Sequence, residues 1–498
     1  MRPRQRRIAV PLLLLLAIGW GAQRCGEFGG DEFAEESRVL PGGFLVRPYR
    51  QLGPAPTPRS SRMLWHTPDV DADWSLEFRP QGHGEEWRTS PTPGWRRIAA
   101  RGVLPHRVYR ADLDGLPPGS AIDWRVRRDG EVVDHGEGRA PRPPGQPHRF
   151  AIFGDCGAGT WNQRAIARQT QLAGPDFLLI AGDIAYTRGR IREYRRRFWP
   201  IYDAAADDPS QGAPLLRSTL FIAAPGNHDL AFRDLRSNPD ALAYFYYWDP
   251  PLNGPEGVEG GPLVPGLVAP GPYREAFLRG AGENYPRSAS YSFDYGDAHW
   301  TVLDSNPYVD WSDPGLREWV ARDLASAKGA AWRFVAMHHP PFNSSYAHRG
   351  DQRMRVLVDL FQAGDVDVVW SGHVHNYQRS FPLTFQADPG PDGRPPRRSD
   401  RIPGRWTLDR EYDGKTRTRP RGIIYVVSGS GGAFLYNPEQ DDDPGSWQPY
   451  TYKLIARFHS LTVADLDAET LTVRQLDAEG RELDRFVVSR SERGTSDP

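Results

Sequence analysis

Cysteine is nearly missing from this chain of 498 residues, which contains only Cys25 and Cys156. Two cysteines cannot build a disulfide framework for a chain of this size. The sequence also lacks an excess of either charge, because its formal net charge is −1. This balance excludes a bulk electrostatic attraction to nucleic acid or to an anionic membrane. We therefore expect no nucleic-acid partner, and we expect packing and bound metals to stabilise the fold.

Long apolar runs are missing after the first 25 residues, so no later segment is predicted to span a membrane. The first 25 residues join the basic stretch MRPRQRR to the apolar stretch IAVPLLLLLAIGWGA, in which Gly19 and Gly21 are small residues suited to cleavage. This layout predicts a secretory signal peptide, and an uncleaved N-terminal anchor is the alternative. A lipid anchor at Cys25 is disfavoured, because Arg24 stands where lipoprotein signals have a small residue. The chain is thus predicted to be secreted, periplasmic or on the cell surface, with no stable membrane span after processing.

The rest of the chain divides into regions of different composition. Segment 26–37 is acidic and glycine-rich, and we interpret it as a linker. Residues 38–146 contain short runs with alternating apolar and polar positions, separated by turns such as DGLPPGS, which predicts an all-β sandwich. The proline-rich stretch RAPRPPGQP at its end is typical of a stiff linker. The tail, 489–498, is predicted to be disordered.

Residues 147–488 have a different pattern, in which short apolar runs alternate with stretches whose apolar residues have the spacing of a helix. In DPGLREWVARDLASA the apolar residues share one helical face, with Pro314 in the first turn: Leu316, Trp319, Val320 and Leu324. Strands that alternate with helices predict an α/β domain with a largely parallel core. The carboxyl ends of its strands are then where a ligand is expected. The segments 250–275 and 385–421, rich in Gly and Pro, are expected to be irregular.

Five of the apolar runs end in groups that can bind metal ions. In chain order these groups are Asp155; Asp183 and Tyr186; Asn227, His228 and Asp229; His338 and His339; and His373 and His375. Any one of them has an ordinary explanation, because Asp and Asn after a strand usually cap or form turns. Five in order, at the end of the sheet where ligands bind, indicate a site.

The residue types indicate which metals the site would bind. In an extended segment alternate side chains share a face, so His373 and His375 can reach one site and serve two adjacent metals. Carboxylate, amide and imidazole ligands suit Zn, Mn or Fe(II), whereas a phenolate from Tyr186 suits a trivalent ion such as Fe(III). Two ions roughly 3.5–4 Å apart can hold the attacking and leaving oxygens of a phosphoryl transfer.

These motifs resemble the signature of the calcineurin-like metallophosphoesterases, and GDxxY has the form found in purple acid phosphatases. The matching blocks are GDCG, GDIAY, GNHD, VAMH and GHVH. The resemblance covers roughly residues 38–488. It implies an α/β fold in which the metallophosphoesterase β-sandwich is flanked by helices, with a fibronectin-like all-β domain before it.

The resemblance also implies ligands and an activity. Fe(III) would bind Asp155, Tyr186 and His375. A divalent Fe, Zn or Mn would bind Asn227, His338 and His373, and Asp183 would bridge both ions. The expected reaction is hydrolysis of a small-molecule phosphate monoester by in-line attack of a metal-bound hydroxide.

Three further residues are expected to be catalytic. His228 would bind a phosphate oxygen or protonate the leaving alcohol, and Asp229 would orient or charge it. His348 stands where plant-type members place phosphate-binding histidines, although Ala347 replaces the first residue of their histidine pair. For His339 a substrate contact and a packing role are both open, and Cys156 is predicted to be structural.

Three alternatives to a monoesterase remain at this point. A phosphodiesterase or nucleotidase could use the same metal ligands, because ligands and fold do not fix the substrate. A non-catalytic cell-surface binding protein is the alternative from another class, and missing ligands would be its sign. A single-metal structural site leaves the joint presence of Tyr186 and both histidine pairs unexplained. The sequence favours no oligomeric state.

Overall fold

The computed structural model of the chain describes residues 38–82, 86–264, 266–389 and 401–490. The predicted signal segment, the acidic linker and nearly all of the predicted tail lie outside these ranges. Within them, no helix has both the length and the apolar character needed to cross a membrane.

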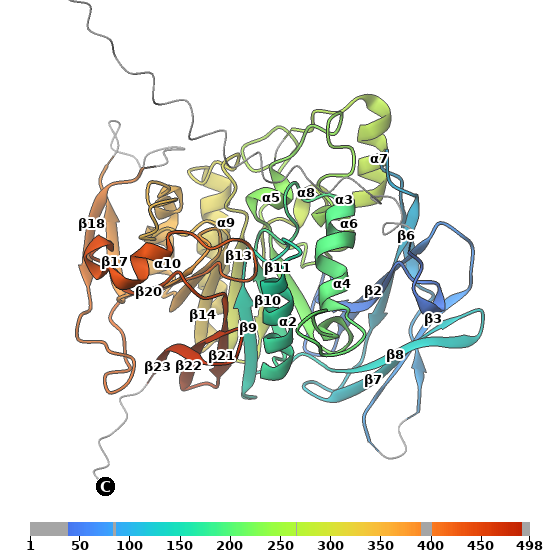
Figure 1. Cartoon of the computed structure of the whole chain (residues 1–498), viewed down its shortest axis with the longest axis horizontal. Coiled ribbons are helices and arrows are strands. Elements are labelled where there is room, and N and C mark those ends of the chain that lie inside the picture. Colours follow the sequence, from blue (N-terminus) through green and yellow to red (C-terminus); the bar gives the residue numbers. More distant parts are fainter. Residues whose placement is uncertain (1–37, 83–85, 265, 390–400, 491–498) are drawn as a thin grey trace, which may run out of the picture.

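Two large β-sheets form the body of the molecule (Figure 1). The ten-stranded sheet has the order β23 (Glu482–Ser489), β22 (Thr470–Asp477), β21 (Ser460–Leu466), β9 (His148–Phe153), β10 (Phe177–Ala181), β11 (Leu220–Ala224), β1 (Val46–Gln51), β2 (Ser61–Pro68), β6 (His106–Leu113) and β5 (Gly94–Ile98). The seven-stranded sheet has the order β12 (Tyr291–Tyr295), β13 (Ala298–Leu303), β14 (Trp332–Met337), β15 (Val368–Ser371), β19 (Ile424–Ser428), β16 (Tyr377–Ser380) and β20 (Thr451–Ile455). The central strands β9, β10 and β11 are parallel, as are β13, β14, β15 and β19.

Two smaller sheets accompany them. One pairs β4 (Arg88–Thr89), β3 (Trp74–Pro80), β7 (Ala121–Arg128) and β8 (Glu131–Arg139), and the other pairs β17 (Leu383–Ala387) with β18 (Gly404–Leu408). The second pair corrects the expectation that 385–421 is irregular throughout. The segment is rich in Gly and Pro, but Leu383 and Phe385 pack into the core that covers the outer face of the seven-stranded sheet.

Short helices connect the strands. The α-helices are α2 (Trp161–Ala173), α3 (Ile191–Glu193), α4 (Trp199–Tyr202), α5 (Asn227–Leu230), α6 (Tyr244–Tyr247), α7 (Gly271–Ala281), α8 (Asn284–Arg287), α9 (Pro314–Ser326) and α10 (Val358–Ala363). Single turns of other helix types are η1 (Pro41–Gly43), η2 (Tyr194–Phe198), η3 (Leu215–Arg217), η4 (Ala327–Gly329), η5 (Arg353–Leu357), η6 (Pro438–Asp442) and η7 (Pro444–Ser446). Helix α7 begins inside the segment 250–275 that was expected to be irregular.

The central strands are apolar on both faces, as the sequence pattern predicts for strands buried between layers. In β9, Phe150 and Ile152 point into the core between the two large sheets. Ala151 and Phe153 point the other way, into the core that contains Ile166 of α2. Helices α9 and α10 cover the seven-stranded sheet in the same manner. The layers are therefore helix, sheet, sheet and helix, which confirms the predicted fold class.

Helix α9 begins where the sequence predicts. The Asp313 side chain accepts a hydrogen bond from the Leu316 N–H at 3.0 Å, and Pro314 occupies the first turn. The four residues of the predicted apolar face are buried, namely Leu316, Trp319, Val320 and Leu324. A capped amphipathic helix of this kind gains most of its stability from the buried face.

The N-terminal region is all-β, as predicted, and lies at one end of the molecule (Figure 1). Its core, which contains Trp65, Trp124 and Leu76, lies between the β1-β2-β6-β5 part of the large sheet and the sheet of β3 and β7. Strand β1 also pairs in parallel with β11, with Arg50 opposite Leu220. One sheet therefore runs from the N-terminal region into the α/β region, and the likeness to a fibronectin domain stays a prediction.

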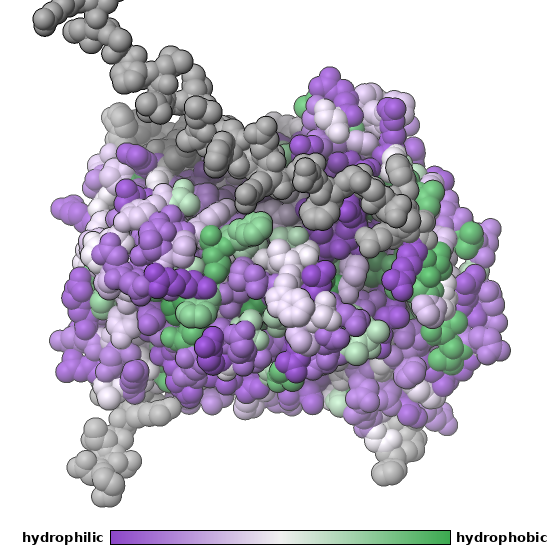
Figure 2. Space-filling view, viewed as in Figure 1, coloured by the Kyte–Doolittle hydropathy of each residue, from purple (hydrophilic) through white to green (hydrophobic). Residues whose placement is uncertain are grey.

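The surface in Figure 2 is mainly hydrophilic, and its hydrophobic residues form small separate groups. Such scattered hydrophobic residues are normal for a folded domain. This face offers no broad apolar area that would indicate a partner.

Candidate metal centre

The carboxyl ends of β9, β10, β11, β14 and β15 meet, and the segments after them supply all the predicted ligands. Backbone hydrogen bonds join these segments both between the two sheets and within one of them. The Gly154 N–H, after β9, donates to the Ser428 carbonyl of β19 in the other sheet at 2.8 Å. The Gly372 N–H donates to the His338 carbonyl at 3.0 Å, which joins the segments after β15 and β14. Most of the predicted ligands are buried in consequence, namely Asp155, Asp183, Tyr186, His338 and His375.

Asp155, Tyr186 and His375 form the first ligand group. The Tyr186 hydroxyl donates to Asp155 Oδ1 at 3.0 Å and lies 3.0 Å from His375 Nε2. His375 Nε2 in turn lies 3.3 Å from Asp155 Oδ1. The three donor atoms therefore face one small volume, as the resemblance implies for Fe(III).

Asn227, His338 and His373 form the second ligand group. Asn227 Oδ1 lies 3.1 Å from His338 Nε2 and 3.1 Å from His373 Nδ1. Asp183 Oδ1 lies 3.3 Å from His338 Nε2. Ligand atoms of Asp155, Asp183 and His338 all lie within 4.8 Å of one another. Asp183 thus lies between the two groups, where a bridging carboxylate is expected.

The hydrogen bonds of the two buried histidines test whether metal ions fit these groups. His338 Nδ1 donates to the Ala181 carbonyl at 2.8 Å, so the Nε2 of the neutral ring carries a lone pair. His375 Nδ1 donates likewise to the Phe434 carbonyl at 2.6 Å. When the rings are neutral, each Nε2 lone pair therefore faces the oxygen atoms of its own ligand group, and these electron pairs repel one another. A cation placed between an Nε2 atom and the oxygen atoms of its group removes this repulsion. Histidines whose other ring nitrogen binds a carbonyl are typical metal ligands.

Three of the predicted ligands have an unusual backbone conformation. The φ angles of Asp155, Asp183 and His373 are 59°, 53° and 67°, in the left-handed region. Such residues cost about 1–3 kcal/mol each and cluster at functional sites. The value for His373 corrects the expectation that His373 and His375 alternate along an extended segment. The chain bends after β15, and His373 reaches the second ligand group while His375 reaches the first.

Gly372 makes this turn possible. A Cβ atom at Gly372 would lie 2.4 Å from the Ala181 carbonyl oxygen and 2.8 Å from Asp155 Oδ2. Real Cβ atoms do not approach other atoms so closely, so only glycine lets the backbone pass this near to the first ligand group.

Ser305, which follows β13, supports the second group and was missed in the sequence. Its Oγ accepts the N–H groups of His338 and His339 at 3.1 and 2.8 Å, and lies 2.9 Å from His339 Nδ1. A hydroxyl has one proton and two lone pairs, so Ser305 donates its proton to His339 Nδ1. The one available signal was that Ser305 also follows a strand-like apolar run.

His228 lies at the edge of the site, with 30% of its side chain exposed. Its Nδ1 donates to the Thr187 carbonyl at 2.6 Å, and its Nε2 lies 3.8 Å from Asp183 Oδ2. The ring centroids of His228 and Tyr186 are 4.5 Å apart. His228 therefore turns its free nitrogen toward the ligand groups.

Asp229 does not hold His228 through any contact among the described residues. The buried Asp229 carboxylate accepts the backbone N–H groups of Gly226 at 2.8 Å and of Ile184 at 3.1 Å. Burial raises the pKa of Asp229, and the charge of Asp183 raises it further. Asp229 thus ties together the loops after β10 and β11, and the Thr187 carbonyl is the partner that orients His228.

His348 lies on the other side of the site. Its ring centroid is 4.3 Å from the ring centroid of His373. The ring centroid of His339 is likewise close to that of His373, at 4.2 Å. Burial, and the nearby charge of His375, lower the pKa of His348. The position agrees with the predicted one, and the phosphate contact stays a prediction.

Cys156 is buried, and burial raises the pKa of its thiol. A thiol that stays protonated is a poor metal ligand, which agrees with the predicted structural role.

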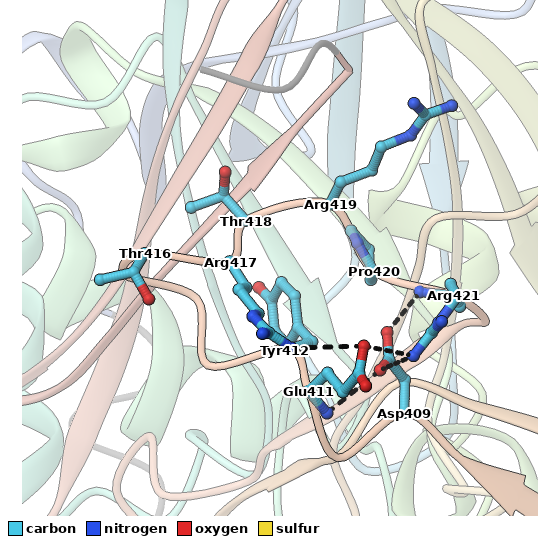
Figure 3. Close-up of a pocket in the computed structure, with 9 residues that line it drawn as sticks. All are labelled: Asp409, Glu411, Tyr412, Thr416, Arg417, Thr418, Arg419, Pro420 and Arg421. Carbon is cyan, nitrogen blue, oxygen red and sulfur yellow. Dashed lines mark hydrogen bonds and ion pairs between the residues drawn. The ribbon is translucent and has the colours of Figure 1, made fainter. Parts of the chain in front are cut away.

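A cavity of about 750 Å³ lies elsewhere on the molecule (Figure 3). It is lined by Asp409, Glu411, Tyr412, Thr416, Arg417, Thr418, Arg419, Pro420 and Arg421. Arg421 and Arg417 form ion pairs with its two carboxylates, so the charges of its lining largely cancel. None of the predicted metal ligands lines it.

The chain is similar in sequence to known phosphoesterases. Residues 148–377 match the model of the calcineurin-like phosphoesterase family. Purple acid phosphatase 21 of Arabidopsis thaliana is 25% identical over 290 residues, which cover 57% of this chain and 56% of the relative. Purple acid phosphatase 23 of the same plant is 25% identical over 367 residues, which cover 68% of this chain and 65% of the relative. The chain thus spans 56% and 65% of the lengths of these two relatives.

A solved structure shows the same fold. Purple acid phosphatase PPD1 from yellow lupin (Lupinus luteus) seeds has a TM-score of 0.61 and 18% identity, over 90% of this chain and 74% of that one. At this identity the likeness concerns the fold alone. Residues 148–377 are therefore similar to the calcineurin-like phosphoesterase family, and the chain is similar in sequence to the purple acid phosphatases.

Proposed function

We propose that this chain is a metal-dependent phosphoester hydrolase that cleaves phosphate monoesters of small molecules at a two-metal site. The observation that carries the proposal is the meeting of two ligand groups around Asp183. Asp183 lies between carboxylate and phenol donors on one side and neutral donors on the other. The similarity to purple acid phosphatases supports the same reaction.

We assign Fe(III) to the group of Asp155, Tyr186 and His375. A divalent Fe, Zn or Mn ion is assigned to the group of Asn227, His338 and His373. When bound, two such ions lower the pKa of water and neutralise the negative charge of the phosphoryl group. A small phosphate ester is the substrate that such a site would take.

The protein's own groups would position the phosphate ester and move a proton. His228 holds its Nδ1 proton on the Thr187 carbonyl, which leaves Nε2 as the nitrogen that faces the substrate. A protonated Nε2 would donate to a phosphate oxygen or to the leaving oxygen, which is general acid catalysis. His348, beyond the second group, would contact the phosphate from the opposite side.

One experiment tests this function directly. Metal content per chain is measured by mass spectrometry, together with the hydrolysis of p-nitrophenyl phosphate and bis(p-nitrophenyl) phosphate over a range of pH. We expect two ions per chain including iron, with the monoester preferred. A preference for the diester would identify a phosphodiesterase on the same ligands. A chain with neither metal nor hydrolysis would instead support a non-catalytic binding protein.

We also infer that the chain is exported, from its basic and then apolar first 25 residues. Cell fractionation and determination of the mature N-terminus test this. An intact N-terminus on protein found in the cytoplasm would contradict it.

A further inference from the structure

The segment Ala433–Tyr436 lies against the first ligand group, although nothing in the proposed reaction has used it. The Ala433 N–H donates to the Asp155 carbonyl at 2.8 Å, and the Tyr436 N–H donates to the His375 carbonyl at 3.0 Å. The Phe434 carbonyl accepts from His375 Nδ1 at 2.6 Å. Three hydrogen bonds therefore fix this segment to two of the ligands assigned to iron.

The side chain of Tyr436 covers one of those ligands. Its ring lies on the His375 imidazole with a centroid distance of 4.0 Å and an interplanar angle of 9°. The ring centroid of His348 lies 5.3 Å from that of Tyr436. Tyr436 therefore stands between a metal ligand and the residue predicted to contact phosphate.

The hydroxyl of Tyr436 has no hydrogen-bond partner among the residues that the structure describes. A neutral phenol is a hydrogen-bond donor, and this one is unused. Stacking on His375 alone would be served equally well by phenylalanine.

The segment that carries Tyr436 lies partly at the surface of the molecule. The neighbouring Phe434 side chain is 83% exposed, although its carbonyl binds a metal ligand. Tyr436 is itself only partly buried, so its side chain is not sealed inside the core.

We propose that Tyr436 is a substrate-binding residue of this site, whose hydroxyl donates a hydrogen bond to an oxygen of the bound phosphate group. The inference rests on the proposed function, because it needs a phosphate ester at the metal centre. The bond is charge-assisted, since the accepting oxygen carries negative charge. His228 beside Tyr186 and Tyr436 beside His375 then contact the phosphate from two sides of the first ligand group.

The variant Tyr436→Phe tests this, because it keeps the stacked ring and removes only the hydroxyl. The dissociation constant of inorganic phosphate is measured by calorimetry on the metal-loaded full chain, with kcat and KM for p-nitrophenyl phosphate and the metal content. We expect phosphate binding and kcat/KM to weaken roughly 10-fold to 100-fold, as for one lost hydrogen bond to a charged group. Metal content should stay at the wild-type value.

Tyr346→Phe is the matched control, because Tyr346 is a phenol on the loop of His348 whose side chain is 43% exposed. It should bind phosphate like the wild type. Tyr436→Ala should in addition lower iron content, because the His375 ring loses its stacked neighbour.

Two results would overturn the inference while leaving the proposed function intact. One is wild-type phosphate affinity and wild-type kcat/KM in Tyr436→Phe. The other is loss of metal in that variant, which would assign the hydroxyl a structural role. A wild-type chain that neither binds phosphate nor hydrolyses either ester would overturn the proposed function itself.

Discussion

The two halves of the candidate metal centre offer different kinds of donor. The half of Asp155, Tyr186 and His375 has a carboxylate and a phenol, so it can carry negative charge of its own. The half of Asn227, His338 and His373 has an amide and two imidazoles, all of them neutral as ligands. The first half therefore suits a trivalent ion and the second a divalent one. Among the predicted ligands, Asp183 is the carboxylate that both halves share.

The halves also differ in what surrounds them. The first is covered by Tyr436 and borders the exposed Phe434. The second is backed by Ser305 and flanked by the His339 and His348 rings. The two halves thus differ in charge and in the residues that support them, so variants in each half should give different results.

Asp183→Asn should have the largest effect, because it removes the charge that both halves share. We expect both ions to be lost and hydrolysis to fall by 100-fold or more, since bound ions supply several kcal/mol of transition-state stabilisation. Mass spectrometry and p-nitrophenyl phosphate turnover measure this. Asp365→Asn is a matched control, because Asp365 has a φ of 52° in an exposed loop. Retention of both ions in Asp183→Asn would refute the bridge.

His228→Ala should have the second largest effect. It should leave the metal content of both halves unchanged. Turnover should fall roughly 100-fold to 10,000-fold, the range for a lost general acid, while both ions stay bound. His135→Ala, on the exposed strand β8, should leave turnover unchanged. If His228→Ala loses an ion, His228 is a ligand and its assigned role is wrong.

Tyr186→Phe should affect the first half alone. A phenolate bound to Fe(III) gives a visible charge-transfer band, which this variant should abolish together with part of the iron. The divalent ion of the second half should remain. Absorption spectra with metal analysis measure both, and a colourless wild-type enzyme that is fully active with zinc or manganese alone would contradict the iron assignment.

Ser305→Ala should have the smallest effect, confined to the second half. Loss of such a supporting hydrogen bond typically costs about 10-fold to 100-fold in metal affinity. Titration with Zn should show weaker binding of the divalent ion, with the visible band unchanged. Ser326→Ala, on the surface of α9, is the control. A change in the band would show that Ser305 supports both halves.

The meeting of the candidate ligands could be predicted because each follows an apolar run, and neighbouring parallel strands bring their carboxyl ends together. The conformation of His373 could not be predicted, because its left-handed φ depends on the close approach of Gly372 to β10 and to Asp155. Asp229 was predicted to orient or charge His228 because the two residues are neighbours in the chain. Its buried carboxylate binds backbone N–H groups instead, one of them from a different loop.

Tyr436 gave no signal in the sequence, because it belongs to no motif and follows a glycine-rich stretch far from the ligands along the chain. Only the fold brings its ring onto His375. Strands β17 and β18 were missed for a similar reason, because the composition of their segment is typical of loops while their apolar side chains fill a core.

The pairing of β1 with β11 makes the N-terminal region a covering for the edge of the sheet that carries the site. Truncation before residue 147 would leave the backbone of β11 without its neighbour on that side. An unpaired, apolar strand edge recruits other chains and promotes aggregation. The two regions are therefore not interchangeable modules, and an attempt to exchange the N-terminal region with that of another protein must supply a strand that continues β11.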